Sequence, residues 1–326
     1  MNQLYPLKFN PIFKDKIWGG QKIKTVLGLD FAPLPNCGEV WVVSGVEGNQ
    51  SVISNGFLSG NELNEIVEVY MGDLVGDKTY QRFGNEFPVL IKFIDANDWL
   101  SIQVHPDDEL AMKRHGCLGK TEMWYLLDAG KDSQLISGFK TKVNRDSYQK
   151  HLENNTLESV LNYENVKKGD VFFMPAGRVH ALGPGVLLAE IQQTSDVTYR
   201  IFDWNRIDQN GLTRELHTEL ALDAIDFSVQ KDYKTQYKSK VNSTINLVES
   251  SYFTTGFLQI TEPMKKDYAE LDSCVIYICT EGGSFFLHNE EKYTLKQGEA
   301  MLIPASIHSL VIHPENQCSL LEVFLA

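Results

Sequence analysis

The sequence has little of what marks several large classes of protein. Its 326 residues include five cysteines, an odd number, and no Cys-x-x-Cys pair, so we expect free thiols in a reducing compartment rather than a disulfide framework. No window approaches the roughly 18 uninterrupted apolar residues of a membrane-spanning helix. The N-terminus has no cationic region followed by an apolar run, so no signal peptide is expected. These absences predict a soluble cytoplasmic protein.

Basic residues are also scarce. Thirty Lys and Arg stand against 43 Asp and Glu, which gives a net charge of −13 at pH 7. Because nucleic-acid affinity comes mainly from clustered Lys and Arg, we expect no nucleic-acid partner, although a local basic pocket for a small anion is compatible with this charge. Hydrophobic residues make up 43% of the chain, enough for one large or two modest cores. A monomer is the default expectation.

Short β-type segments are abundant in this chain. They are apolar and bounded by Gly, Pro, Asn or Asp, which predicts strands at 40–44, 89–94, 99–104, 123–127, 171–174, 186–191, 274–279, 284–287, 300–303 and 319–324. Helical patterns are fewer, at 61–71 with Asn61 as its cap, at 145–157, at 213–225 and in a short stretch from Pro106. Many short strands separated by turns predict barrels or sandwiches of the jelly-roll kind.

An internal echo indicates two related β-domains. Gly169-Asp-Val-Phe-Phe-Met-Pro175 reads as a glycine turn, a strand and a proline turn, and His180 follows it. Gly298-Glu-Ala-Met-Leu-Ile-Pro304 repeats that spacing, with His308 one residue sooner after the proline. The charged, low-apolar stretch 230–240 is the expected link. We therefore predict one domain over 1–228 and a second over 229–326.

Four potential metal ligands lie in the first of these units. Gln103 and His105 are two residues apart, so an extended backbone points both side chains to one face. Glu122 and His180 lie in later predicted strands. Each residue alone would be an ordinary strand residue, but a mixed nitrogen and oxygen set suits a catalytic divalent ion better than a structural cysteine-bound zinc. Zinc is the first expectation, while manganese, cobalt and iron fit the same ligand types.

A second group of polar residues follows in 189–206. Arg200 lies among aromatic residues, and a buried arginine there needs an anion or an acidic partner. A structural pair with Asp196 or Glu190 would satisfy it equally well. Lys120 precedes Glu122 by two residues and shares its face, so either this lysine or a metal would neutralise the buried carboxylate.

Several motifs resemble those of type I mannose-6-phosphate isomerases, a branch of the cupin superfamily. The segment 87–108, which contains Gln-Val-His-Pro-Asp-Asp, resembles the family signature. Gly38-Glu-Val-Trp41 and the segments 119–125, 174–182 and 190–204 resemble further motifs in the expected order. The resemblance covers roughly residues 5–220, and the last hundred residues resemble only a degenerate cupin.

This resemblance implies a mainly β fold of two cupin-type jelly-roll domains, with a few helices attached to the N-terminal one. Residues 1–228 would form the catalytic metal-binding domain and 229–326 the degenerate one. One zinc ion per chain would be held by Gln103, His105, Glu122 and His180. The substrate would be a phosphosugar, with mannose 6-phosphate and fructose 6-phosphate interconverted through an enediolate.

The resemblance also assigns catalytic positions. Arg200 matches the catalytic arginine of the family, and its pKa above about 12 favours charge stabilisation over proton removal. Lys120 and Glu190 match positions considered for proton handling, and Asp196 or a metal-bound water are the alternatives. Arg206 lies where the long forms carry a lysine after the arginine. A non-catalytic sugar-binding cupin and a metal-dependent cupin oxygenase are the rival interpretations.

Overall fold

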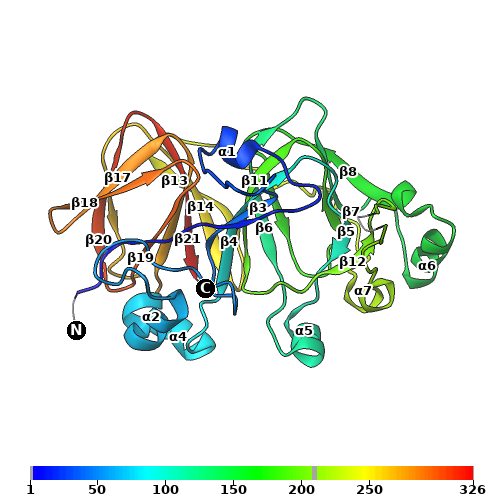
Figure 1. Cartoon of the computed structure of the whole chain (residues 1–326), viewed down its shortest axis with the longest axis horizontal. Helices are drawn as coiled ribbons and strands as arrows, with labels where there is room; N and C mark the ends of the chain where they lie inside the picture. Colours follow the sequence, from blue (N-terminus) through cyan, green and yellow to red (C-terminus); the bar gives the residue numbers. More distant parts are fainter. Residues whose placement is uncertain (1–2, 208–210, 326) are drawn as a thin grey trace.

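The computed structural model describes residues 3–207 and 211–325 and shows two antiparallel β-barrels lying side by side (Figure 1). Each barrel consists of a larger sheet and a smaller sheet that face each other. The fold is mainly β, as the sequence predicts. No helix in the described residues has the length and apolar character needed to cross a membrane.

The first barrel contains the predicted metal ligands. In the described residues its larger sheet has the strand order β2 (Ile12–Lys14), β3 (Glu39–Val43), β4 (Val89–Ala96), β11 (Val186–Gln193), β6 (Glu122–Ala129) and β9 (Val171–Met174). Its smaller sheet has the order β12 (Tyr199–Phe202), β5 (Ile102–Val104), β10 (His180–Leu182), β7 (Gln134–Phe139) and β8 (Leu161–Asn165).

The second barrel repeats this pairing pattern. Its larger sheet has the order β1 (Leu7–Lys8), β19 (Ala300–Ile303), β16 (Val275–Glu281), β21 (Cys318–Leu325), β14 (Phe253–Ile260) and β13 (Ser243–Glu249). Its smaller sheet has the order β15 (Met264–Asp267), β20 (Ser309–Pro314), β17 (Gly283–His288) and β18 (Glu291–Lys296). β21 lies between β14 and β16 as β11 lies between β4 and β6. Gly169 and Gly298 both have positive φ, +87° and +82°, which confirms the predicted glycine turns before β9 and β19.

The helices are short and lie around the barrels. Within the described residues they are α1 (Lys22–Thr25), α2 (Leu63–Tyr70), α3 (Gly72–Val75), α4 (Asp77–Phe83), α5 (Asp108–His115), α6 (Arg145–Glu153), the 3₁₀ helix η1 (Leu157–Val160) and α7 (Thr218–Ala224). The helices α5, α6 and α7 lie beside the first barrel (Figure 1). The α2–α4 group lies instead against the second barrel, where the amide nitrogens of Ala305 and Ser306 donate to the carbonyls of Leu74 and Asp73.

Three predicted helices begin later than the sequence patterns indicate. The short helix predicted from Pro106 begins at Asp108, with Asp107 as its N-cap. The helix predicted at 61–71 has Glu62 as its N-cap, because Glu62 and Glu65 form a reciprocal capping box, so Asn61 stays outside. The helix predicted at 213–225 begins only at Thr218. The preceding residues are tied to β12, since the amide nitrogen of His217 donates to the carbonyl of Arg200 at 2.7 Å.

The larger sheets of the two barrels pack against each other through one face. Met123, Tyr125 and Leu127 of β6 belong to a core that also contains Phe257 and Leu321 of the second barrel, and the rings of Tyr125 and Phe257 stack with centroids 5.6 Å apart. Because side chains alternate along a strand, the intervening residues of β6 point into the first barrel. The interior of this barrel is therefore available for a functional site.

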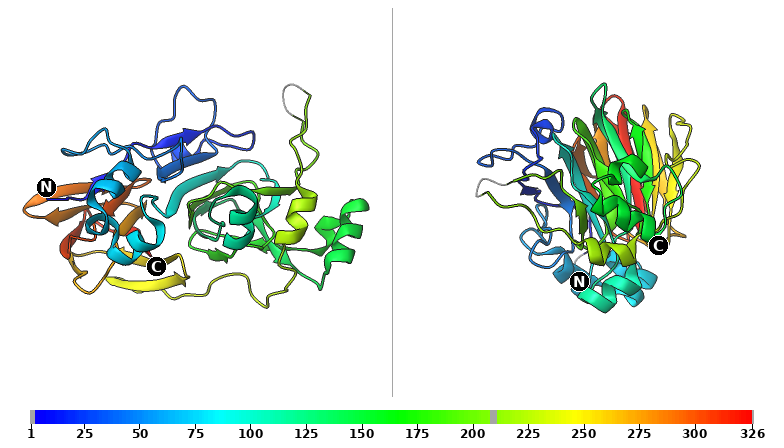
Figure 2. Two further views of the ribbon diagram at one scale, coloured as in Figure 1. Left: turned by 90° about the horizontal axis from the view of Figure 1, so that it is seen from below. Right: turned by 90° about the vertical axis from the view of Figure 1, so that its right-hand side faces the viewer.

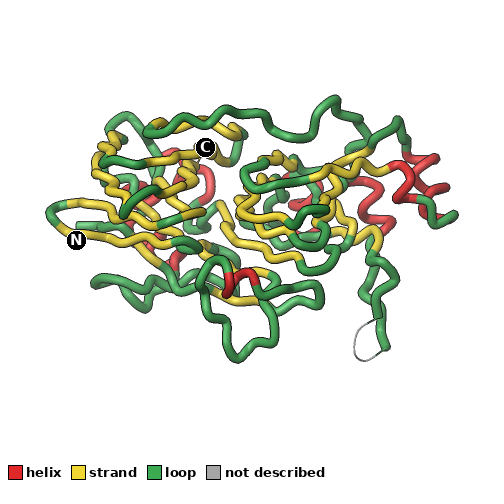
Figure 3. Tube along the Cα trace, turned by 90° about the horizontal axis from the view of Figure 1, so that it is seen from above, coloured by secondary structure: helices red, strands yellow, loops and turns green. Residues whose placement is uncertain are grey.

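The predicted link runs from α7 to β13 along the outside of the first barrel (Figures 2 and 3). Tyr233 and Tyr237 donate hydrogen bonds to the carbonyls of Phe139 and Gly169, at 2.9 and 2.7 Å. Although this stretch has few apolar residues, these two tyrosine hydrogen bonds attach it to the first barrel. The boundary between 228 and 229 stays a prediction.

Candidate active site

The predicted histidine and carboxylate ligands meet inside one end of the first barrel. His105 follows β5, Glu122 opens β6 and His180 opens β10 opposite Gln103. The three are buried, with ligand atoms within 4.8 Å of one another. In the part of the chain that the structure describes, no other group of three or more His, Cys, Asp or Glu side chains meets this criterion.

The Glu122 carboxylate lies close to both imidazoles. Its Oε1 is 3.2 Å from Nε2 of His180, and its Oε2 is 3.7 Å from Nε2 of His105. The Nδ1 atoms of His105 and His180 lie 2.9 and 2.8 Å from the carbonyl oxygens of Val197 and Arg178. A carbonyl accepts only, so each Nδ1 carries the proton and each Nε2 presents its lone pair toward the cluster.

Burial sets the protonation of these groups. It lowers the pKa of His180 to about 4 and that of His105 well below its usual range, so both imidazoles are neutral near pH 7. Burial raises the pKa of Glu122 to about 7, and the negative charge of Glu190 acts in the same direction. The set thus combines two neutral nitrogen donors with a carboxylate whose negative charge is not fully compensated by the cations around it.

This donor set fits a divalent metal ion. Oε1 of Glu122 is buried and has no hydrogen-bond partner, which is costly for a carboxylate unless a cation lies beside it. The side-chain nitrogen of Gln103 lies 3.3 Å from Nε2 of His180, and turning the amide over would offer its oxygen to the same place. Lys120 donates to Glu122 at 2.9 Å, the pairing the sequence indicates, and its Nζ lies 3.2 Å from Nε2 of His105.

A cavity of about 300 Å³ opens beside this cluster. The predicted residues Gln103, Lys120, His180, Glu190 and Arg200 all line it. Its wall also includes residues to which the sequence assigns no role, among them Lys16, Glu39, Lys92, Trp124 and Arg214. The structure therefore brings Gln103, His180 and the predicted catalytic residues to one pocket, next to the buried His105 and Glu122.

A buried ion-pair network forms one wall of the pocket. Lys92 of β4 lies 3.0 Å from Oε1 of Glu190 and 3.6 Å from Oε2 of Glu39. Trp124 donates to the other oxygen of Glu190 at 2.7 Å, and Trp41 donates to Glu39 at 2.8 Å. Burial alone would raise the pKa of Glu190, but the charges of Lys92 and Lys120, together with the bond from Trp124, outweigh burial and hold that pKa below its usual range. A lysine within the apolar strand 89–94 was the available sequence signal for this network.

Arg200 makes neither of the carboxylate pairs considered from the sequence. Within the described residues no carboxylate lies within 4.0 Å of its guanidinium, whose Nη1 donates to the carbonyl of Glu215 at 2.7 Å. Its Nε is buried with no hydrogen-bond partner. Burial, and next the charge of Arg214, lower its pKa from the usual value. Arg206 does not line the pocket and donates instead to the carbonyl of Trp99 at 2.6 Å.

The second barrel has a counterpart of this pocket wall but lacks counterparts of the candidate ligands. Glu322 of β21 pairs with Tyr277 of β16, as Glu190 pairs with Trp124, and Tyr277 donates to Glu322 at 2.5 Å. By the same strand register, the position of Glu122 in the first barrel corresponds to Val275 in the second. His308 is exposed. Within the described residues the only cluster of three potential His, Cys, Asp or Glu ligands therefore lies in the first barrel.

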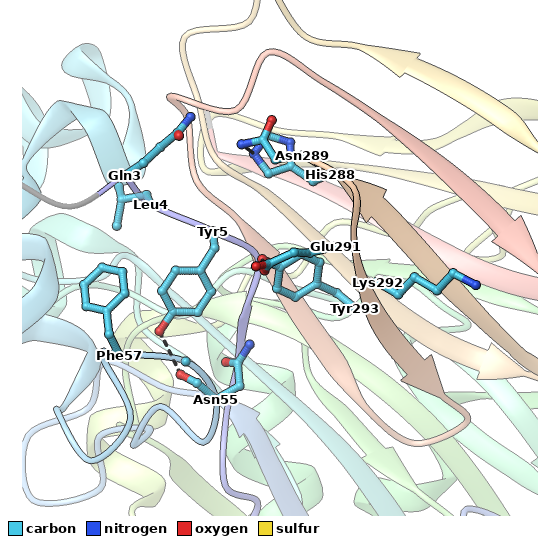
Figure 4. A pocket seen from close by; sticks show the side chains of 11 residues that line it. Gln3, Leu4, Tyr5, Asn55, Phe57, His288, Asn289, Glu291, Lys292 and Tyr293 are labelled. Atoms are coloured by element: carbon cyan, nitrogen blue, oxygen red, sulfur yellow. Dashed lines mark hydrogen bonds between the residues drawn. The ribbon is translucent and has the colours of Figure 1, made fainter.

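Another cavity, of about 670 Å³, lies between the N-terminal segment and the β17–β18 hairpin of the second barrel (Figure 4). The ring of Tyr5 lies between those of Phe57 and Tyr293, and its hydroxyl donates to the carbonyl of Asn55 at 2.7 Å. The predicted ligands and catalytic residues are absent from its lining. Its aromatic contacts anchor the loop that contains Gly56.

Comparison with known proteins agrees with the geometry of the first barrel. Residues 6–136 match the family model "Phosphomannose isomerase type I, catalytic domain", and residues 243–324 match "Mannose-6-phosphate isomerase, cupin domain". The chain is 34% identical over 324 residues to mannose-6-phosphate isomerase ManA of Bacillus subtilis, covering 96% of this chain and 97% of the relative. It is 33% identical to mannose-6-phosphate isomerase of Streptococcus mutans, covering 93% and 94%.

Solved structures give the same result. The crystal structure of mannose 6-phosphate isomerase from Bacillus subtilis superposes with a TM-score of 0.88 at 30% identity, covering 98% of this chain and 99% of that one. A putative mannosephosphate isomerase from Archaeoglobus fulgidus shares the fold, with a TM-score of 0.80 at 20% identity and 99% of each chain covered. The chain therefore belongs to the type I phosphomannose isomerase (mannose-6-phosphate isomerase) family.

Proposed function

We propose that this protein is a metal-dependent aldose–ketose isomerase that interconverts mannose 6-phosphate and fructose 6-phosphate. The observation that carries the proposal is the buried His105, Glu122 and His180 cluster beside a polar pocket that Arg200, Lys120 and Glu190 also line. Family membership supplies the substrate. The protein would act as a cytoplasmic monomer, with a catalytic domain over 1–228 and a degenerate cupin domain over 229–326.

One zinc ion per chain would be held by His105, Glu122 and His180, with the amide oxygen of Gln103 completing the set. When bound, such an ion polarises a carbonyl and stabilises adjacent sugar oxygens. The neutral imidazoles and the orphaned Oε1 of Glu122 support this assignment. Manganese, cobalt and iron suit the same donors, so the choice of zinc rests on ligand chemistry and on the family.

Isomerisation moves a proton between carbon 2 and carbon 1 of the open-chain sugar, and negative charge develops on the two neighbouring oxygens. Arg200 is placed to stabilise that charge, because its guanidinium lines the pocket without a carboxylate partner within 4.0 Å in the described residues. Oε1 of Glu190 is already ion-paired with Lys92 at 3.0 Å and Oε2 accepts a hydrogen bond from Trp124, which suits binding of a sugar hydroxyl better than proton transfer. We assign the proton transfer to Lys120, which contacts His105 and Glu122 and opens to the pocket.

The test is a coupled assay that measures fructose 6-phosphate formed from mannose 6-phosphate by the purified, zinc-loaded protein. We expect turnover that is abolished by chelation and restored by zinc. Binding of the sugar phosphate without turnover would indicate a non-catalytic sugar-binding cupin. Oxygen consumption by the iron-loaded protein would indicate an oxygenase, and either result would overturn the proposal.

A further inference from the structure

Three arginines surround a single buried carboxylate at the end of β12. Asp203 follows this strand and is buried, with 6% of its side chain exposed. Arg214 binds it through two bonds, from Nε to Oδ2 at 2.7 Å and from Nη2 to Oδ1. Arg206 also donates to Oδ1, at 2.5 Å. Arg200 lies close enough for the charge of Arg214 to lower its pKa. The cluster therefore carries more positive than negative charge.

The other cations of the pocket are matched by carboxylates. Lys16 lies 3.3 Å from Glu39, Lys92 lies 3.0 Å from Glu190, and Lys120 lies 2.9 Å from Glu122. In the described residues Arg200 has no such partner within 4.0 Å. The pocket's unbalanced positive charge thus lies on the β12 side, near Arg200 and Arg214. Asp196 also lines the pocket, but it is exposed, where solvent screens its charge.

Arg206 and Arg214 differ in where their guanidiniums lie. Arg206 is outside the pocket lining; its Nη1 donates to the carbonyl of Trp99 at 2.6 Å and is 3.6 Å from the exposed Asp98. Arg214 lines the pocket, and its bidentate pair with Asp203 leaves Nη1 outside that pair. Only Arg214 of the two can therefore present a donor to a molecule in the pocket.

The position of this cluster matches the length of a sugar phosphate. Arg200 pairs with Gln103 in the β5–β12 register, so it starts beside the candidate metal ligands. Asp203, which holds Arg214, is three residues further along, about 10 Å at the usual rise of a strand. A sugar whose carbons 1 and 2 face His105 and His180 would direct its opposite end, which carries the phosphate, toward Arg214.

We propose that Arg214 binds the phosphate group of the substrate, and that Arg206 only holds the segment after β12 in place. This inference rests on the proposed function for the identity of the sugar, but not for the binding of a phosphate anion. A planar guanidinium fixed by Asp203 is preorganised to bind a phosphate oxygen. Asp203 is thus a positioning residue, and the Arg214–Asp203 pair sets the specificity for a phosphorylated sugar.

The experiment compares Arg214→Gln, Arg206→Gln and Asp203→Asn with the unmodified protein. Inorganic phosphate is the probe for calorimetric binding, and mannose 6-phosphate is the substrate for steady-state kinetics. For Arg214→Gln we expect the dissociation constant of phosphate and the KM to rise about ten-fold or more, with kcat changed less than about three-fold, because a bond to a charged group is lost in ground and transition states alike. Arg206→Gln should leave both quantities within about three-fold of the unmodified protein.

Asp203→Asn separates anion binding from a purely structural role. If Arg214 only orders the loop through Asp203, removing either partner weakens phosphate binding alike. If Arg214 binds the anion, Asp203→Asn keeps a side-chain oxygen that accepts from Arg214 and so holds its position, while it removes a negative charge, so phosphate affinity should stay equal or increase. Unchanged phosphate binding in Arg214→Gln, an equal loss in Arg206→Gln, or a ten-fold loss in Asp203→Asn would each overturn the inference. Because phosphate binding needs no turnover, failure of the isomerase assay would overturn the proposed function alone.

Discussion

Glu190 and Lys92 lie opposite each other in the β11–β4 pairing, and their charged groups are 3.0 Å apart inside the first barrel. Both are buried, at 3% and 5% exposure. The indole of Trp124 holds the second oxygen of Glu190, and its ring meets that of His180 edge-on with centroids 5.3 Å apart. The ion pair therefore fixes the pocket wall next to the candidate metal ligands.

Removing one partner of this pair should be strongly destabilising. Lys92→Met leaves Glu190 buried without its cation, and we expect a loss of about 3–5 kcal/mol in the free energy of unfolding. The double variant Lys92→Met/Glu190→Gln should recover part of that loss, because no unpaired charge remains there. Urea unfolding measures both. Lys168→Met, which breaks the exposed pair with Glu281, is the control and should cost less than about 1 kcal/mol. A Lys92→Met loss no larger than this control would contradict the account.

Arg200→Ala should fold normally and retain the metal while losing turnover. The variant gives up one hydrogen bond, to the carbonyl of Glu215, but loses the cation that faces the developing charge. We expect kcat to fall by about two to three orders of magnitude, as for removal of a donor to an oxyanion. The measurements are steady-state kinetics, metal content and thermal unfolding. Near-normal turnover would remove Arg200 from the mechanism.

Metal affinity should depend on pH through Glu122 rather than through the histidines. The pKa of Glu122 is raised to about 7, so protons compete with the metal below pH 7, whereas His180, with a pKa of about 4, does not take up a proton until much lower pH. Between pH 7 and 5 the apparent zinc-binding constant should fall about ten-fold per pH unit, the slope for one proton. Competition with a chromophoric chelator measures it. A slope of two or three protons would mean that the histidines titrate near their usual pKa. That result would contradict the claim that burial keeps both imidazoles neutral in this pH range.

The residues that form the candidate metal cluster could be predicted from the sequence because their signal is local. Gln103 and His105 are two residues apart, so an extended backbone points both side chains to one face. The glycine-to-proline spacing before His180 recurs before His308, which marks that segment as part of a repeat. The same local signals located ten of the 21 strands in the described residues, and β9 and β19 have the predicted bounds. Agreement was best where a strand is bounded by a glycine and a proline.

The wall of the pocket depends on pairings between distant segments, which local patterns do not encode. Lys92 meets Glu39 and Glu190 only because β4 lies between β3 and β11. The sequence pattern predicts Arg214 at the start of a helix, but Arg214 binds Asp203 and lines the pocket, and α7 begins only at Thr218. The α2–α4 group lies on the second barrel through backbone bonds between distant residues, for which the sequence carries no pattern.

The most direct measurement is metal content together with turnover in His180→Ala, compared with His308→Ala as the matched control. His180 is buried in the ligand cluster, whereas His308 is the exposed histidine after the repeated proline turn. We expect His180→Ala to lose the metal and the isomerase activity together, and His308→Ala to keep both. A metal-free His180→Ala protein with full activity would contradict the central claim that a divalent ion held in the first barrel supports catalysis.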